Sequence, residues 1–371
     1  MPGATHFVIA AIISAVLSAA MCYGLARWSG QLRLMAQPRP DRWHQKPTPN
    51  TGGLGVLIAC AFGYLLFAGT GYGAVAACAG GVSILGFVDD RLQLHPRAKF
   101  AGQTAAAVVL ISTGMSLHLT PWTWANGAIT ALWIVGITNA FNLIDNMDGL
   151  CGGVAAIVAG SGAWLAILQR DYDRALLLLV VAGSCLGFLT INYKPARIFM
   201  GDCGSLFLGF SLASFALSRP VPVTGSPVLH SFYPLTAFLY PIFDMGLVSV
   251  LRRSAGKPVS VGGRDHSSHR LVSAGLTERK AVWVFWACAA VSASCGPLMY
   301  RMPGWFIATA ALLLIALAVF GIFLARLPGF AHPASAPIRK SWGAGAADRV
   351  VIVPDHTALH HESPVQNGIS P

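Results

Sequence analysis

Long apolar segments separated by short polar stretches make up most of the sequence. Eleven of them lie near residues 6–26, 53–69, 72–88, 101–119, 125–144, 150–168, 174–192, 204–218, 231–251, 281–300 and 304–325. Most have the roughly 17 to 25 residues that a helix needs to cross a bilayer. The eighth is short, and the fifth ends in polar residues. The pattern predicts an all-α, polytopic membrane protein with about 11 transmembrane helices.

The polar–apolar pattern changes near residue 327. Residues 1–326 are predicted to form one transmembrane domain, because no polar stretch within them is long enough for a soluble domain. Residues 327–371 are rich in Ala, Pro, Ser, Gly and His, a composition that cannot bury enough apolar surface to fold. We expect them to form a disordered cytoplasmic tail.

Composition and charge set the orientation. The chain is 55% hydrophobic and 11% charged, whereas soluble domains carry roughly 25% charged residues. The net charge of +11 reflects only 14 acidic residues, so it does not indicate a nucleic-acid partner. With the N-terminus outside, 21 of the 25 Lys and Arg residues fall in cytoplasmic loops and the tail. This positive-inside bias predicts an outer N-terminus and a cytoplasmic C-terminus.

Half of the acidic residues gather at the predicted cytoplasmic ends of apolar segments. They are Asp89, Asp90, Asp145, Asp148, Asp202, Asp244 and Asp265. Carboxylates at such depth are costly unless they are paired or bind a metal. A transporter would more often place them near the bilayer midplane, so the pattern favours a site on the cytoplasmic face.

Asp89 and Asp90 are adjacent where the third apolar segment ends. Neighbouring carboxylates repel one another, and a divalent cation relieves the repulsion while binding phosphate oxygens. Lys99 follows nine residues later and is a candidate phosphate contact. The alternative interpretation is a solvated helix end.

A second group of polar residues has a spacing of three. It consists of Asn139, Asn142, Asp145 and Asp148. On a helix this spacing gives a polar ridge along one side. The alternative is hydrogen bonding between spanning helices.

Asp202 lies between glycines in IFMGDCGS, residues 198–205, at the start of the eighth segment. Backbone N–H groups at a helix start favour an anion, so this turn is suited to a metal-binding carboxylate beside a pyrophosphate. The alternative is simple helix capping by Asp and Ser.

The most basic loop contains GGRDHSSHRL, residues 262–271. His266 and His269, flanked by Arg264 and Arg270, are candidate phosphate contacts. The carboxylates already offer hard oxygen ligands suited to Mg²⁺ or Mn²⁺, which disfavours a metal at the histidines. Lys46, in RWHQKPTPNTGG (42–53), is a further candidate substrate contact, with a purely topological role as the alternative.

Together these motifs resemble the polyprenyl-phosphate N-acetylhexosamine-1-phosphate transferases. The family's DD motif matches Asp89-Asp90, and its NxxNxxDGxDGL matches residues 139–150. MGDxGS matches residues 200–205, and a PTPxxGG-like entry to the second span matches residues 47–53. The ordered set covers roughly residues 40–275 and is far more specific than any one motif.

Two positions depart from the family pattern. The first Asp-Gly pair reads Asp145-Asn146 here, so that glycine is not required or the turn differs. The histidine motif, commonly HxHH followed by Arg-Leu, has Ser268 at the middle histidine. The translocase branch of the family carries three consecutive histidines, which this chain lacks, so the chain is most similar to the GlcNAc-type branch.

The resemblance implies an enzyme that joins a UDP-sugar to polyprenyl phosphate and releases UMP, with Mg²⁺ or Mn²⁺ as cofactor. By the same resemblance Asp202 is the metal ligand, with Asp90 supporting the metal or the lipid phosphate. Asp89 accepts the lipid phosphate's proton, and a covalent phospho-aspartyl route stays open. Asn139, Asn142, Asp145 and Asp148 hold the uridine diphosphate. His266 and His269 are candidate catalytic residues that, with Arg264 and Arg270, contact phosphate or sugar groups.

The implied setting is a bacterial inner membrane with the active site facing the cytoplasm. The expected partners are the UDP-sugar, an undecaprenyl-type phosphate and membrane lipid, with a homodimer left open and no nucleic acid. An Mg²⁺-dependent intramembrane prenyltransferase with an aromatic acceptor is the alternative. Such enzymes are expected to show two Asp-rich motifs with DxxxD spacing, whereas the acids here are adjacent or three apart.

Overall fold

A computed structural model describes residues 4–30, 35–36, 47–67, 70–217, 232, 234–256 and 266–327. The chain divides into two units, Met1–Ala331 and His332–Pro371. The second unit lies outside the described residues, and so does all of the expected tail except Leu327. The fold described below belongs to the first unit.

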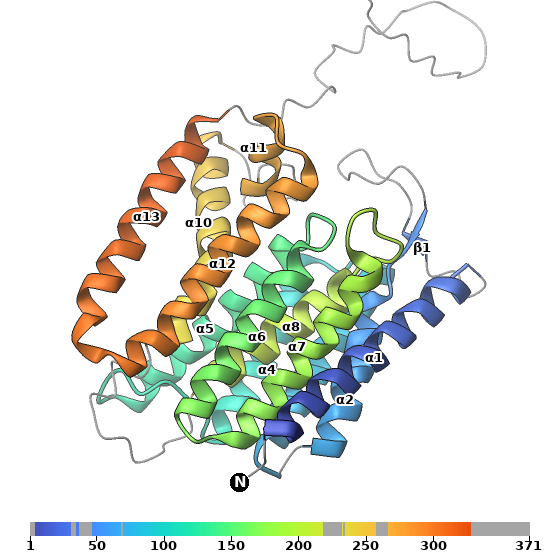
Figure 1. Cartoon of the computed structure of the whole chain (residues 1–371), viewed down its shortest axis with the longest axis horizontal. Helices are drawn as coiled ribbons and strands as arrows, with labels where there is room; N and C mark the ends of the chain where they lie inside the picture. The colour runs from blue at the N-terminus through green and yellow to red at the C-terminus, as the bar shows by residue number, and fades with distance from the viewer. Residues whose placement is uncertain are drawn as a thin grey trace, which may run out of the picture. The chain divides into compact units, whose positions relative to one another are not determined.

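The described part of the first unit is mostly helical (Figure 1). Its α-helices are α1 (Ala4–Trp28), α2 (Gly52–Phe67), α3 (Gly73–Leu92), α4 (Pro96–Ser112), α5 (Thr123–Ile144), α6 (Leu150–Leu168), α7 (Tyr172–Asn192), α8 (Gly201–Ala216), α10 (Leu239–Ser254), α11 (Ser267–Ser273), α12 (Glu278–Arg301) and α13 (Phe306–Arg326). Short 3-10 helices are η1 (Thr70–Tyr72), η2 (Thr236–Phe238) and η3 (Pro303–Trp305). Strands β1 (Met35–Ala36) and β2 (Thr48–Pro49) pair antiparallel.

Each of the eleven predicted apolar segments contains a helix. Among the described residues, seven helical stretches are long and apolar enough to span a membrane: α1, α3, α5, α6, α7, α12 and Pro303–Arg326. The remaining segments hold the shorter helices α2, α4, α8 and α10. The chain is thus a helical membrane protein, while the total of 11 spans stays a prediction.

Both boundaries of α4 lie several residues before the expected ones. This helix begins at Pro96 rather than near residue 101, because proline suits the first helical turn and His95 accepts a hydrogen bond from the N–H of Arg97. It ends at Ser112, and Gly114 follows with a φ of +89°. The earlier start brings Lys99 into the first turn.

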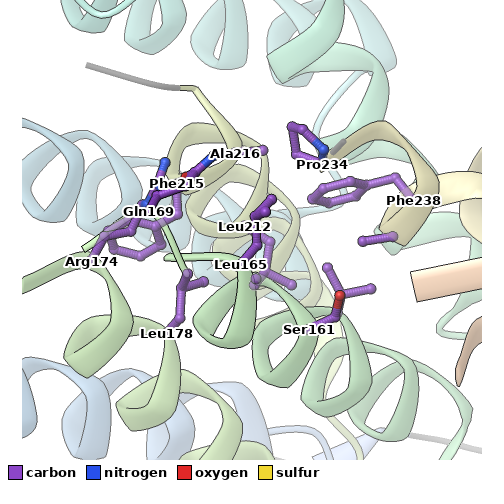
Figure 2. Close-up of a pocket in the computed structure, with 13 residues that line it drawn as sticks. Ser161, Leu165, Gln169, Arg174, Leu178, Leu212, Phe215, Ala216, Pro234 and Phe238 are labelled. Atoms are coloured by element: carbon purple, nitrogen blue, oxygen red, sulfur yellow. Dashed lines mark hydrogen bonds between the residues drawn. The ribbon is translucent and has the colours of Figure 1, made fainter. Parts of the chain in front are cut away.

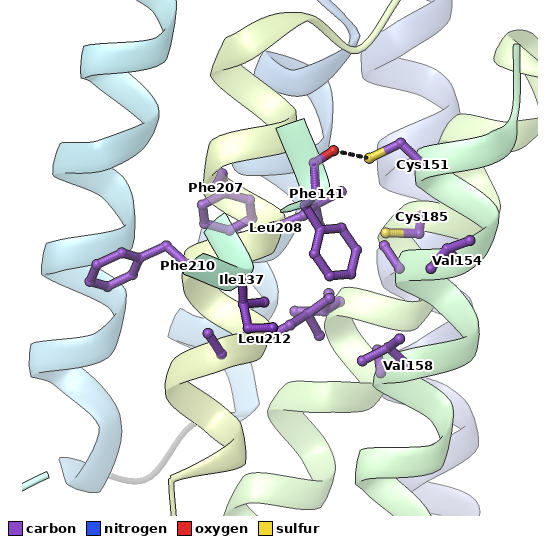
Figure 3. Packing of buried hydrophobic residues seen from close by; sticks show 14 of the residues in the cluster. Ile137, Phe141, Cys151, Val154, Val158, Cys185, Phe207, Leu208, Phe210 and Leu212 are labelled. Carbon is purple, nitrogen blue, oxygen red and sulfur yellow. Dashed lines mark hydrogen bonds between the residues drawn. The ribbon is translucent and has the colours of Figure 1, made fainter. Parts of the chain in front are cut away.

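Close backbone packing joins α1 to α7. Cβ atoms on Gly183 and Gly187 would lie 2.2 Å and 2.0 Å from the carbonyl oxygens of Ala11 and Ala15. Small residues one turn apart allow such contact between membrane helices. The hydrophobic core contains fully buried side chains such as Phe141 of α5 and Leu208 and Phe210 of α8 (Figure 3).

The helices fall into two neighbourhoods. α10, α12 and α13 contact one another along one side, whereas α1, α2 and α7 pack together on the other (Figure 1). α13 leaves most of its apolar side chains exposed, with Ile307 at 80% and Leu312 at 67%. Such a surface is tolerated where lipid rather than water surrounds the helix.

Candidate active site

The end of α3 lies against the first turn of α8 because glycine stands at their contact. A Cβ atom on Gly86 would lie 2.3 Å from the carbonyl oxygen of Asp202. One turn earlier, Ser83 Oγ donates to a backbone carbonyl of α8 at 3.0 Å. Small residues permit this approach. The contact brings Asp89 and Asp90, at the end of α3, to Asp202 at the start of α8.

Lys99 is the cation at the centre of these carboxylates. Its Nζ donates to Asp89 Oδ2 at 2.8 Å and also pairs with Asp202 Oδ2. The side chains of Lys99 and Asp202 are 18% and 25% exposed, so the group is open on one side. Two carboxylates that share one ammonium group mark a point where positive charge is strongly favoured.

Asp90 is held at the amino end of α8 by three donors. Its Oδ1 accepts from the N–H of Asp202 at 3.0 Å and from Asn50 Nδ2 at 2.8 Å, and its Oδ2 accepts from the N–H of Cys203 at 3.1 Å. The first N–H groups of a helix have no partner inside the helix and carry partial positive charge. Asp90 therefore caps α8 from the neighbouring helix α3.

The segment before α2 lies along the segment before α8. The N–H of Phe199 donates to the carbonyl of Pro49 at 2.7 Å, and the N–H of Gly53 donates to the carbonyl of Met200 at 2.9 Å. A Cβ atom on Gly53 would lie 2.2 Å from the backbone nitrogen of Gly204. The motifs at residues 47–53 and 200–205 are thus joined through their backbones. This contact places Asn50 beside Asp90.

The predicted polar ridge on α5 divides between two helices. Asn142 Nδ2 donates to Asp202 Oδ1 at 3.0 Å and to Ser205 Oγ at 2.9 Å. One turn earlier, Asn139 Nδ2 donates to Gln103 Oε1 on α4 at 2.7 Å. Asn142 therefore belongs to the carboxylate group, while Asn139 joins α5 to α4.

Asp145 and Asp148 lie in the turn between α5 and α6. Asp148 Oδ2 accepts from the N–H of Ala196 at 3.1 Å. Gly149 has a φ of +80°, and its N–H donates to Asn192 Oδ1 at 2.8 Å. Asn146 lies outside the positive-φ region, so the turn does not need the family's first glycine there. Both acids remain partly exposed.

The histidine segment is buried at the start of α11. His266 Nδ1 lies 3.0 Å from Asp244 Oδ2, and the N–H of Ser267 donates to Asp244 Oδ1 at 2.9 Å. His269 is 3% exposed. Arg270 Nη1 donates to the carbonyl of Leu327 at 3.0 Å, at the end of α13. Lys46 and Arg264, the other predicted substrate contacts, lie outside the described residues.

Comparisons with known proteins identify the family of the chain. Residues 72–219 match the family model described as Glycosyl transferase family 4. A Bacillus subtilis protein named "Probable undecaprenyl-phosphate N-acetylglucosaminyl 1-phosphate transferase" is 31% identical over 90% of this chain and 96% of its own length. The chain belongs to the polyprenyl-phosphate N-acetylhexosamine-1-phosphate transferase family.

Other relatives represent different branches of this transferase family. The decaprenyl-phosphate N-acetylglucosaminephosphotransferase of Mycolicibacterium smegmatis is 32% identical over 67% of this chain and 71% of the relative. A phospho-N-acetylmuramoyl-pentapeptide-transferase of Geobacillus thermodenitrificans is 33% identical over 68% of this chain and 84% of the relative. The matched stretch 72–219 contains the motifs from Asp89 to Ser205.

Two polar residues of this region, Asn50 and Gln103, were missed as candidates in the sequence, and the partner of a third, Asp244, was not predicted. Asn50 binds Asp90, Gln103 binds Asn139, and Asp244 binds the histidine segment. Gln103 is fully buried and lies one turn after Lys99 on α4, and an amide side chain inside a predicted apolar segment is a signal that the sequence offers. Asp244 was among the acids at segment ends, but no spacing linked it to His266, 22 positions away.

The donor chemistry of the site fits Mg²⁺. Within the described part of the chain, no three His, Cys, Asp or Glu side chains converge as a complete metal site. Mg²⁺, however, is commonly held by one or two carboxylates together with substrate phosphates and water. Asp202 and Asp89 present oxygens toward one shared cation, Lys99. The residues thus suit a metal that arrives with a diphosphate.

A small cavity lies far from these carboxylates. Its volume is about 30 Å³, and it is lined by α6, α7, α8 and the segment around Pro234 and Phe238 (Figure 2). Phe215, which lines it, is 13 residues along α8 from Asp202, a distance of roughly 20 Å at 1.5 Å per residue. The volume suits a water molecule or two, so this cavity is not the substrate site.

Proposed function

We propose that this chain transfers an N-acetylhexosamine-1-phosphate from a UDP-sugar to an undecaprenyl-type phosphate, as the first membrane step of a cell-envelope glycan pathway. The named relatives act with undecaprenyl or decaprenyl phosphate and an N-acetylated sugar phosphate. The observation that carries the proposal is the group formed by Asp89, Lys99, Asp202 and Asn142, with Asp90 capping α8. None of the relatives reported above is named as an aromatic prenyltransferase, the alternative function.

In the proposed reaction a lipid phosphate oxygen forms a bond to the β-phosphorus of the UDP-sugar. The bond from that phosphorus to the bridging oxygen breaks, and UMP leaves. Asp89, which is partly exposed, accepts the proton of the lipid phosphate. In the alternative covalent route, Asp89 itself attacks the β-phosphorus. Positioning and charge neutralisation supply most of the rate in phosphoryl transfer.

The site's cations offset the meeting of two anions. Mg²⁺ (or Mn²⁺) bound to Asp202, with Asp90 in support, would neutralise diphosphate charge. Asp90 orients the first turn of α8 through its backbone contacts. Lys99 moves its ammonium group from the carboxylates toward substrate phosphate when the substrates bind. The roles of Asp90 and Asp202 need these carboxylates to be fixed before the substrates meet.

The remaining predicted residues are proposed to contact the substrates. Asn139, Asn142, Asp145 and Asp148 are proposed to hold the uridine diphosphate, and His266 and His269 to contact its phosphate or sugar groups in catalysis. The loop after α7 contacts one of these residues, since the N–H of Ala196 donates to Asp148 Oδ2. Lys46, Arg264 and Arg270 stay predicted substrate contacts.

We also propose that the N-terminus lies outside the cell, the C-terminus inside, and the active site at the cytoplasmic face of the plasma membrane. The ends of α3 and α5 and the start of α8 all carry site residues, so these residues share one end of the helices. The loops predicted at this end carry most of the Lys and Arg residues. A homodimer stays a prediction.

Release of UMP tests the function directly. Membranes containing the full chain should release UMP from a UDP-N-acetylhexosamine only when both polyprenyl phosphate and Mg²⁺ or Mn²⁺ are present. Release that survives a chelator, or that does not need the lipid, would rule out the proposal. A panel of UDP-sugars in the same assay identifies the sugar.

Asp202→Asn tests the metal assignment. The amide keeps the shape of the carboxylate but removes its charge, so turnover should fall by a factor on the order of 10³. Asp173→Asn, an exposed acid in the first turn of α7, is the matched control and should keep wild-type turnover. Near-normal turnover of Asp202→Asn would remove Asp202 from the metal site.

A further inference from the structure

A hydrogen bond between two uncharged side chains joins α11 to the turn between α5 and α6. Ser268 Oγ donates to Asn146 Oδ1 at 2.8 Å, across 122 positions of sequence. Asn146 Nδ2 donates to the carbonyl of Leu143 at 2.8 Å, which turns the amide oxygen toward α11. Ser268 is fully buried, so its hydroxyl would be costly to leave without a partner.

The two residues before Ser268 bind a different helix. His266 and Ser267 both contact the carboxylate of Asp244 on α10. Three consecutive residues therefore fix the start of α11 from two sides. α11 has only seven residues, and a helix of that length is not stable without tertiary contacts. Its placement against the α5–α6 turn depends on bonds of this kind, because its main packing is on α10, α12 and α13.

We propose that Asn146 and Ser268 are positioning residues, which hold His269 and Arg270 of α11 in register with Asp145 and Asp148 of the turn. The sugar nucleotide then meets both groups in one fixed arrangement. The inference rests on the proposed function for its substrate, and on the hydrogen bond between the two side chains for its geometry.

Asn146 and Ser268 are also the two positions where the sequence departs from the family motifs, and the departures contact each other. A glycine at 146 has no side chain to accept a bond. A histidine at 268 is much larger than serine, and the site of Ser268 is fully buried against its surroundings. Asn146 has no positive φ that would call for glycine. We therefore expect Asn146 and Ser268 to be replaceable by the glycine and histidine of the family motifs only together.

Kinetics of alanine variants test the bond. Asn146→Ala and Ser268→Ala should each raise the KM for the UDP-sugar by about tenfold, the effect of one lost hydrogen bond to a positioned group. The KM for polyprenyl phosphate should stay within about twofold. The losses should not add in the double variant, because all three variants lack the same bond. Ser273→Ala is the control, since Ser273 Oγ bonds within α11 and does not reach the turn.

An exchange toward the family pattern tests the pairing. Ser268→His alone should lower kcat/KM by a factor on the order of 100, because the larger ring meets Asn146. Adding Asn146→Gly removes that obstruction and should restore kcat/KM to within about tenfold of the wild type. Additive losses in either the alanine or the exchange series would overturn the proposal, as would equal changes in both KM values.

Hydrogen exchange separates this proposal from the proposed function. In the full-length protein, backbone amides of α11 should exchange faster in Asn146→Ala and Ser268→Ala than in the wild type or Ser273→Ala. This result is independent of turnover. If the wild type released no UMP, the proposed function would fail, and the exchange rates alone would decide the pairing. Unchanged exchange in α11 would overturn the positioning role.

Discussion

The carboxylate site and the histidine segment are held in place by different kinds of contact. At the carboxylate site, α3 meets α8 at Gly86 with no room for a side chain, and Asp90 binds two backbone N–H groups of α8. At the histidine segment, side chains make the connections, with Asp244 on one side and Asn146 on the other. The first region is built on backbone, and the second on side chains.

This difference matches two requirements of the proposed reaction, charge neutralisation and substrate binding. Charge neutralisation at phosphorus needs fixed groups, because a misplacement of 1 Å costs about 100-fold in rate. Backbone contacts between long helices provide such rigidity. A segment held by a few side chains can be altered through single side-chain pairs, and Asn146 and Ser268 are both substituted relative to the family motifs. We therefore expect substitutions to affect turnover in the first region, and stability or substrate binding in the second.

Among the variants that compare the two regions, Lys99→Met should give the largest effect. The variant keeps the length of the side chain but removes the ammonium group shared by Asp89 and Asp202. Turnover should fall by a factor on the order of 10² to 10³, as for loss of a preorganised charge-stabilising group. UMP release at saturating substrates measures it.

The control for this variant is Lys280→Met on α12, where the lysine is exposed. Lys280→Met should keep wild-type turnover. The unfolding midpoint of Lys99→Met should stay close to that of the wild type, because the site is open to solvent on one side. Turnover of Lys99→Met equal to that of Lys280→Met would contradict a catalytic role for the cation.

Gly86→Ala should give the next largest effect. The added methyl group would meet the Asp202 carbonyl oxygen and force α3 away from α8. We expect a loss of about 1–3 kcal/mol in unfolding free energy and a fall in turnover of about 100-fold. Gly81→Ala is the matched control on the same helix, since a Cβ there meets nothing within 4 Å. Similar values for the two variants would show that the close contact does not position the site.

Apolar segment length predicted the positions of the helices well, because each span must satisfy its own backbone in the bilayer. The start of α4 was placed too late, since Pro96 and His95 extend the helix beyond its apolar part. α11 was not predicted at all. Its seven residues form no apolar run, and it exists as a helix through contacts with α10, α12 and α13.

For the site, the sequence predicted residues that the structure brings together, but not how they pair. Asp89, Asp90, Asn142 and Asp202 were candidates from local spacing, and the structure brings them together. Local spacing cannot show that Lys99 pairs with Asp202, 103 positions later, or that Asn50 binds Asp90. Those pairings follow from glycine contacts between helices. Gln103 could be recognised as an amide within an apolar segment, whereas the link from Asp244 to His266 could not be recognised from local spacing.

Of these variants, Asp244→Asn should have the smallest effect on turnover. The buried carboxylate accepts from the N–H of Ser267 and contacts His266 Nδ1. The amide keeps one acceptor, but its NH₂ group replaces the other. We expect a loss of about 1–3 kcal/mol in unfolding free energy, with a fall in turnover of only about tenfold, because the carboxylate site keeps its backbone contacts.

Thermal unfolding and UMP release, measured on the same preparations, give the two quantities for Asp244→Asn. Ser249→Ala is the control, since Ser249 Oγ bonds only along α10 to the carbonyl of Met245. The two variants should change turnover and stability in opposite ways. Lys99→Met should lose turnover and keep its stability, whereas Asp244→Asn should lose stability and keep most of its turnover. A turnover loss in Asp244→Asn as large as in Lys99→Met, at unchanged stability, would place Asp244 in the reaction itself. The histidine segment would then have to be as rigidly coupled to the carboxylates as α3 is to α8.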